Sequence, residues 1–234
     1  FYKYLSVFSE VLRLVRQAYV DETDLRTLMA GALEGSSDAL DPFSMYIPEP
    51  EVESYLEARR IGSSRSGLKL VKVRGAVYVM AVQDDSPATV AGIERGDVVT
   101  KLAGLSTRGM PLWEIEVRLA GPASSSLDFE ILRAGETSEV ELVLGSFEVA
   151  APTLEEVAGL HVLTIPAFKT DTAAGVGELL GGLEADRLLV DLRGVVWGDV
   201  ETGYEVAKLF VRGELGSLVG NDGPIKKFTN SDEI

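Results

Sequence analysis

The chain has 234 residues, of which 46% are hydrophobic and 25% charged, and its formal net charge at pH 7 is -15. This acidic balance argues against binding to nucleic-acid backbones or anionic lipid surfaces, which both require clustered Lys and Arg. The absence of cysteine excludes disulfides, thiolate nucleophiles and Cys-bound metals, and a lone histidine, His161, argues against a zinc site. We therefore expect a protein without metal or cofactor that does not bind nucleic acid.

The first sixty residues are predicted to be helical. Residues 4–20 place apolar side chains on one helical stripe, and Asp24 is typical of an N-cap for a second helix. Prolines break residues 40–50, and a short charged helix is expected over residues 49–60.

A β-rich region follows. Two apolar runs are separated by Arg74-Gly75, which predicts a hairpin turn. Residues 98–104 read as a short strand, residues 110–119 have helical spacing, and residues 127–133 and 139–145 alternate with the period of a strand. These elements are sufficient for one small domain.

The most specific segment is SPATVAGIERGDVV, residues 86–99. Pro87 can begin a helical turn, Gly92 suits a left-handed C-cap, and Gly96 turns the chain before Asp97. This order of residues resembles a signature that is frequent in bacterial PDZ domains. The resemblance covers residues 62–146 and implies that the domain binds a peptide as an added strand, with its terminal carboxylate held by a loop of backbone N–H groups.

By position, the resemblance assigns the carboxylate loop to Arg65, Ser66, Gly67 and Leu68, and the edge strand to Leu68, Lys69 and Leu70. The helical wall of the groove would then come from residues 112–119. Its inward positions are Leu112, Ile115 and Leu119, and each of these three is equally compatible with a plain core position.

The last third of the chain changes pattern. Residues 160–168 read as a strand, 170–185 as a helix rich in Gly and Ala, 187–194 as an apolar strand and 203–211 as an amphipathic helix. Alternation of strand and helix predicts a parallel β/α layer.

Three motifs in order, FSEVLRLVRQAYVDE, LDPFSMY and LLVDLRG, flank the PDZ-like segment. With it, they resemble the carboxyl-terminal processing (tail-specific) serine proteases over nearly the whole chain. In this family the PDZ domain presents substrate tails to a serine activated by a lysine, and a Gly-rich loop after DLRG helps build the oxyanion hole.

The chain departs from that family at two points. The family usually reads DLRGNPGG, whereas residues 191–199 read DLRGVVWGD, so that only Gly194 and Gly198 remain as oxyanion-loop positions; the substituted residues include Val196 and Trp197. The family's serine segment should follow Phe210, with its lysine further on, and neither occurs before Ile234. The resemblance therefore implies that this chain alone does not cleave peptides.

The expected fold class is α+β, with a helical module at residues 1–61, a PDZ domain at 62–146 and the beginning of a protease core at 147–234. The expected function is to bind C-terminal tails of protein substrates as part of a processing protease. The alternative is a non-catalytic PDZ adaptor or pseudoprotease that tethers or senses such tails. The resemblance further implies a cell-envelope, periplasmic or secreted location, and it is compatible with a homodimer.

Overall fold

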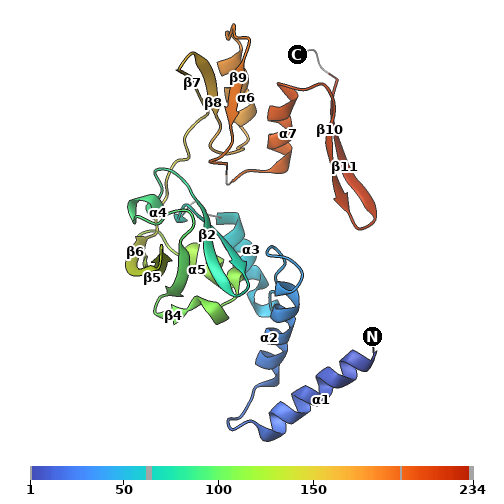
Figure 1. The fold of residues 1–234 in the computed structure, drawn as a ribbon. Helices are drawn as coiled ribbons and strands as arrows, with labels where there is room; N and C mark the ends of the chain where they lie inside the picture. Colours follow the sequence, from blue (N-terminus) through green and yellow to red (C-terminus); the bar gives the residue numbers. More distant parts are fainter. Residues whose placement is uncertain (1, 62–64, 196, 232–234) are drawn as a thin grey trace. The chain divides into compact units, whose positions relative to one another are not determined.

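The computed structural model describes residues 2–61, 65–195 and 197–231. It contains two compact units (Figure 1). The first comprises residues 1–82 and 86–147, and the second comprises residues 83–85 and 148–234. Gly62, Ser63, Ser64 and Val196, which belong to the predicted PDZ boundary and the predicted oxyanion loop, lie outside the described residues.

The first unit begins with helices, as predicted. They are α1 (Tyr2–Ala18), α2 (Leu25–Asp38), the 3-10 turn η1 (Glu49–Glu51) and α3 (Val52–Ile61). Asp24 caps α2 because its carboxylate accepts hydrogen bonds from the amides of Arg26 and Thr27, which have no partner inside the helix. None of the side chains of α1 is buried.

A six-stranded antiparallel sheet forms the centre of this unit. Its main path runs β1-β2-β3-β5-β6, and β4 pairs with β3. The strands are β1 (Leu68–Val73), β2 (Ala76–Val82), β3 (Val98–Leu102), β4 (Leu105–Ser106), β5 (Ser126–Arg133) and β6 (Glu136–Val143). Three hairpin turns, Arg74-Gly75, Ala103-Gly104 and Ala134-Gly135, have positive φ at both residues, as expected for two-residue turns that match strand twist.

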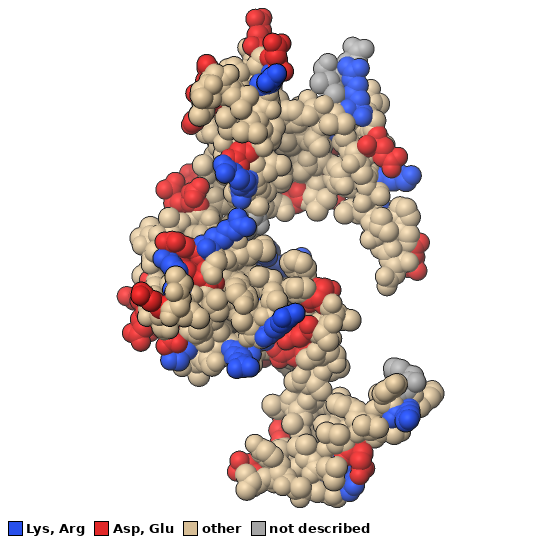
Figure 2. Space-filling view, viewed as in Figure 1, with Lys and Arg blue, Asp and Glu red and all other residues tan. Residues whose placement is uncertain are grey.

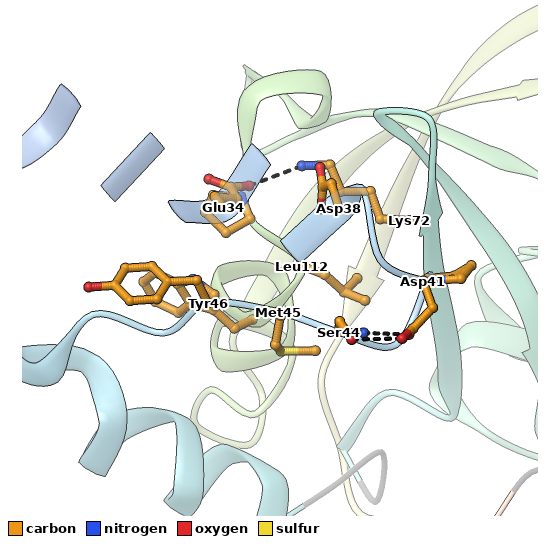
Figure 3. A pocket seen from close by; sticks show the side chains of 11 residues that line it. Glu34, Asp38, Asp41, Ser44, Met45, Tyr46, Lys72 and Leu112 are labelled. Atoms are coloured by element: carbon orange, nitrogen blue, oxygen red, sulfur yellow. Dashed lines mark hydrogen bonds and ion pairs between the residues drawn. The ribbon is translucent and has the colours of Figure 1, made fainter. Parts of the chain in front are cut away.

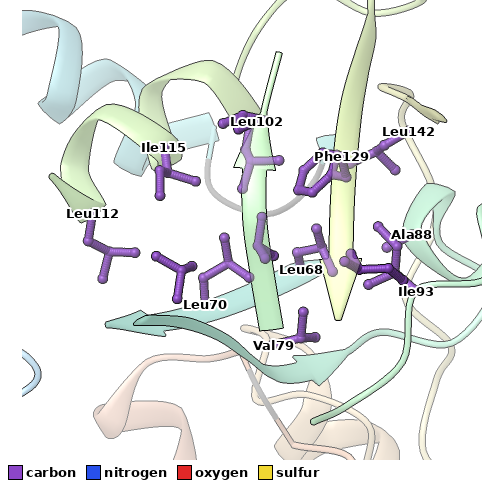
Figure 4. Packing of buried hydrophobic residues seen from close by; sticks show 14 of the residues in the cluster. Leu68, Leu70, Val79, Ala88, Ile93, Leu102, Leu112, Ile115, Phe129 and Leu142 are labelled. Atoms are coloured by element: carbon purple, nitrogen blue, oxygen red, sulfur yellow. The ribbon is translucent and has the colours of Figure 1, made fainter. Parts of the chain in front are cut away.

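The SPATVAG segment forms a short helix, α4 (Pro87–Val90), capped by Ser86 and followed by Gly92 at a φ of 76°. A longer helix, α5 (Leu112–Leu119), covers one face of the sheet. The hydrophobic core lies between α5 and the sheet, and in it Leu112 and Ile115 point toward Leu70 (Figure 4).

The second unit has a three-stranded sheet in the order β7-β8-β9. Its elements are β7 (Thr153–Val157), β8 (Leu160–Thr164), α6 (Thr172–Leu180), β9 (Leu188–Asp191), α7 (Val200–Lys208), β10 (Gly213–Gly220) and β11 (Gly223–Asn230). The predicted parallel pairing of two strands around a helix is confirmed by β8 and β9. The antiparallel strand β7 and the hairpin of β10 and β11 were not predicted.

Charged side chains of both signs are interspersed on the face shown in Figure 2. In the part of the chain that the structure describes, no helix has the length and apolar character needed to cross a bilayer.

A buried ion pair fastens the end of the SPATVAG segment to β5. The carboxylate of Asp97 is 1% exposed and accepts two hydrogen bonds from the Arg133 guanidinium, at 2.6 and 2.7 Å. It also accepts the Glu94 amide at 2.8 Å, and Arg133 donates to the carbonyl of Gly92. Burial alone would raise the pKa of Asp97, but these hydrogen bonds and the Arg133 charge outweigh it and hold the pKa below its usual value.

Asp97→Asn should lower the free energy of unfolding by about 2 kcal/mol at pH 7, because it weakens the charge-assisted hydrogen bonds between the buried side chain at position 97 and Arg133. The exposed carboxylate of Asp128 provides the matched control, Asp128→Asn. Since the pKa of Asp97 is lowered by folding, its stabilising effect should persist above the unfolded pKa and disappear as the pH falls through the folded one. Urea unfolding from pH 7 to pH 3 measures both effects. Equal stability of the two variants at pH 7 would contradict the assignment.

Candidate functional site

The predicted carboxylate loop is buried and held by backbone hydrogen bonds. The carbonyl of Arg65 accepts from the Gly145 amide, and the carbonyl of Ser66 accepts from the Ala88 amide, both at 2.9 Å. The amide of Leu68 donates to Ser66 Oγ at 3.2 Å. The loop is thus fixed at the start of β1, and one N–H that a bound carboxylate would use currently has a side-chain partner.

Gly67 is required at this position for two reasons. Its φ is 77°, and a Cβ added to it would lie 2.1 Å from the side chain of Ser86. Any other residue would therefore be strained and would push α4 away. The close approach explains why a glycine in the loop and a small, capping serine in the SPATVAG segment occur together.

The predicted edge strand and helical wall lie beside each other. Among the described strands, β1 pairs with β2 alone, so its other edge faces the region beside α5. Leu68 and Leu70 are buried in the core, whereas Lys69 between them is partly exposed. On α5, the three positions expected to face the groove also belong to the core: Leu112, Ile115 and Leu119. Their assignment to a peptide groove remains a prediction.

Glu116 lies on the helix of the predicted groove, and the sequence analysis did not single it out. It follows Leu112 by four residues, which places it on the same side of α5 as that leucine, next to the core stripe. Burial raises the pKa of Glu116, and the charges of Lys69 on β1 and Arg59 on α3 oppose that shift. The groove-side wall of α5 therefore carries a desolvated carboxylate rather than a purely apolar surface. In the sequence, the position of this glutamate one helical turn after Leu112 was the feature that could have indicated a carboxylate beside the core stripe.

A small pocket lies between α2, the segment after it and the start of α5 (Figure 3). Lys72 Nζ donates to Glu34 Oε1 at 3.2 Å and to the Met110 carbonyl at 3.0 Å, which ties α2 to the sheet. Ser44 Oγ donates to Asp41 at 2.7 Å and braces the turn after α2. The pocket volume of about 20 Å³ is enough for roughly one water molecule.

The predicted oxyanion loop lies in the second unit. Asp191 accepts hydrogen bonds from the amide and guanidinium of Arg193, which lower its pKa to about 2. Gly198 packs against Phe168: its φ is 143°, and an added Cβ would lie 2.5 Å from that side chain. The amide of Phe168 donates to the Trp197 carbonyl at 3.0 Å, so the loop is joined to the segment after β8. Gly194 is exposed, and a Cβ added to it would have no described neighbour within 4 Å.

Glu116→Gln should stabilise the protein at neutral pH and have little effect near pH 4. Because folding raises the pKa of Glu116, the folded state keeps a proton that the unfolded state loses, and stability falls as the pH rises between the two pKa values. The Gln side chain of the variant does not titrate, so the variant does not lose stability as the pH rises. Thermal unfolding at pH 4 and pH 7, with Glu53→Gln on the exposed face of α3 as control, measures the difference. A lower melting temperature for the variant at pH 7 would contradict the desolvated-carboxylate account.

Comparison with known proteins agrees with this geometry. The PDZ domain family model matches residues 65–144. The carboxy-terminal-processing protease of Bartonella bacilliformis is 25% identical over 229 residues, which cover 94% of this chain and 53% of that protein. The carboxy-terminal processing protease CtpB of Bacillus subtilis is 24% identical over 219 residues, which cover 89% and 46%. The chain thus spans about half the length of the curated relatives it matches.

A solved structure of a photosystem II D1 C-terminal processing protease has a similar fold. The TM-score is 0.71 at 23% identity, and the match covers 96% of this chain and 69% of that one. The α+β fold class predicted from the sequence is confirmed by this similarity and by the PDZ match. The chain therefore contains a PDZ domain, and over nearly its whole length it is similar in sequence and fold to PDZ-containing carboxy-terminal processing proteases.

Proposed function

We propose that this chain binds the free C-terminal tails of protein substrates between β1 and α5, as the tail-recognition part of a carboxyl-terminal processing serine protease. The observation that carries the proposal is the edge position of β1 directly after a loop with a positive-φ glycine. An edge strand offers unpaired backbone groups to an incoming peptide, and the loop before it offers amides to a terminal carboxylate.

The proposed binding mode is strand addition. The peptide backbone would pair with Lys69 and its neighbours on β1, and its carboxylate would lie against the amides of Gly67 and Leu68. A carboxylate is a stronger acceptor than a hydroxyl, so it can replace Ser66 Oγ as the partner of the Leu68 amide. The Arg65 guanidinium, at the start of the loop, adds a positive charge near that end of the groove.

The proposed hydrolysis belongs to the whole protein. Within residues 1–234 we assign no nucleophile; Gly194 and Gly198 are proposed as parts of the loop that borders the reaction site. Support for Gly198 comes from its tight packing on Phe168, which fixes the backbone of the loop without any side chain. A fixed backbone is what stabilisation of a developing oxyanion requires.

The second candidate is a non-catalytic PDZ adaptor that only tethers or senses peptide tails. The observation in its favour is the composition of the loop, where Val195 and Trp197 stand beside the two glycines. Bulky side chains restrict the backbone conformations that a glycine pair would permit. Both candidates share the same peptide-binding groove.

A fluorescent peptide with a free, apolar C-terminus should bind, and its amidated twin should bind at least about tenfold more weakly, because amidation removes the charged acceptor. Fluorescence polarisation measures both affinities. Equal affinities would remove the carboxylate loop from the account.

Arg65→Ala should weaken binding of the free-acid peptide severalfold and leave the amidated peptide nearly unaffected. The matched control is Arg95→Ala, which removes an exposed arginine from the turn before β3.

A further inference from the structure

Helix α3 packs along α5 in the first unit (Figure 1). Only two of its side chains are buried, Tyr55 at 9% exposure and Ala58 at 5%. They are three residues apart and therefore lie on one face of the helix. The other residues of α3 are exposed or partly exposed, so this face is what attaches α3 to the domain.

Both α3 and β1 pack against α5. Glu116 on α5 interacts electrostatically with Lys69 on β1 and with Arg59 on α3, and its charge also acts on Tyr55. Charged or polar residues of β1 and α3 thus lie near one carboxylate of α5. A peptide added to β1 would have to lie in this same space between β1 and α5.

The loop at the end of this space is also closed. Ser66 and Leu68 are buried, and the Leu68 amide is occupied by Ser66 Oγ. A chain terminus must therefore replace Ser66 Oγ at the Leu68 amide. In the sequence, only three residues separate the end of α3 at Ile61 from the loop that begins at Arg65.

We infer that α3 is an intramolecular cover of the peptide groove, which a C-terminal tail must displace in order to bind. The inference rests on the proposed tail-binding function and adds its regulation. Tyr55 and Ala58 take the place that ligand side chains would occupy against α5, and Arg59 supplies a cation near Glu116. A groove that is open about 1% of the time binds its ligand about 100-fold more weakly than one that is always open.

Cysteine labelling tests the cover directly, because the natural chain has no cysteine. In Ala58→Cys the thiol should react slowly with a maleimide, and saturating free-acid peptide should speed the reaction severalfold, since the covered position becomes exposed. The matched control is Leu56→Cys at a position that is 57% exposed, where the rate should be fast and unaffected by peptide. A peptide that binds without changing the rate at position 58 would overturn the cover.

Affinity provides the second test and separates the cover from the function. Ala58→Glu puts a negative charge into the contact with α5, which already carries Glu116, so it should bind the free-acid peptide about tenfold more tightly than Leu56→Glu, which alters only the exposed face. Circular dichroism checks that both variants fold. Equal, measurable affinities would overturn the cover and retain tail binding. No binding by either variant or by the natural chain would overturn tail binding, and the cover of a peptide groove with it.

Discussion

The close contact between Gly67 and Ser86 is the constraint on which the geometry of the PDZ domain depends. Because Gly67 has no Cβ, the loop before β1 can lie directly on the start of α4. There the Ser66 carbonyl accepts a hydrogen bond from the Ala88 amide. This contact fixes where β1 begins and therefore where its open edge lies relative to α5. The ion pair of Asp97 and Arg133 fixes the other end of the same segment against β5. The motif that identifies the domain in the sequence is thus also the part that positions its binding edge.

At Glu116, burial raises the pKa of the carboxyl, and the positive charges of Lys69 and Arg59 lower it. A carboxylate withdrawn from water is costly unless a cation accompanies it, and here Lys69 and Arg59 supply partial compensation from β1 and α3. Because the pKa of Glu116 remains raised, this compensation is incomplete, and the packing of α3 on α5 has to come from the buried side chains of Tyr55 and Ala58 instead.

Much of the fold could be predicted from the sequence because its signals were local. The Asp24 cap, the Arg74-Gly75 turn and the SPATVAG segment each contain within a few residues the groups that determine their conformation. The hairpin of β10 and β11 was missed because Gly216, Gly220 and Gly223 interrupt the alternation that marks a strand. The role of α3 was not accessible either, since its short charged sequence gives no indication of where Tyr55 and Ala58 dock. The assignment of residues 65–70 and 112–119 to a peptide groove stays a prediction, and the burial of these residues could not be predicted because it depends on packing between distant segments.

The central claim is that the first unit holds its peptide groove closed with its own helix. Hydrogen–deuterium exchange measured by mass spectrometry, with and without saturating free-acid peptide, tests it most directly. We predict opposite changes in two neighbouring segments: faster exchange in α3, residues 52–61, as the helix leaves α5, and slower exchange in residues 65–72 as the peptide pairs with β1. Slower exchange in both segments, or no change in α3 while residues 65–72 become protected, would contradict the account.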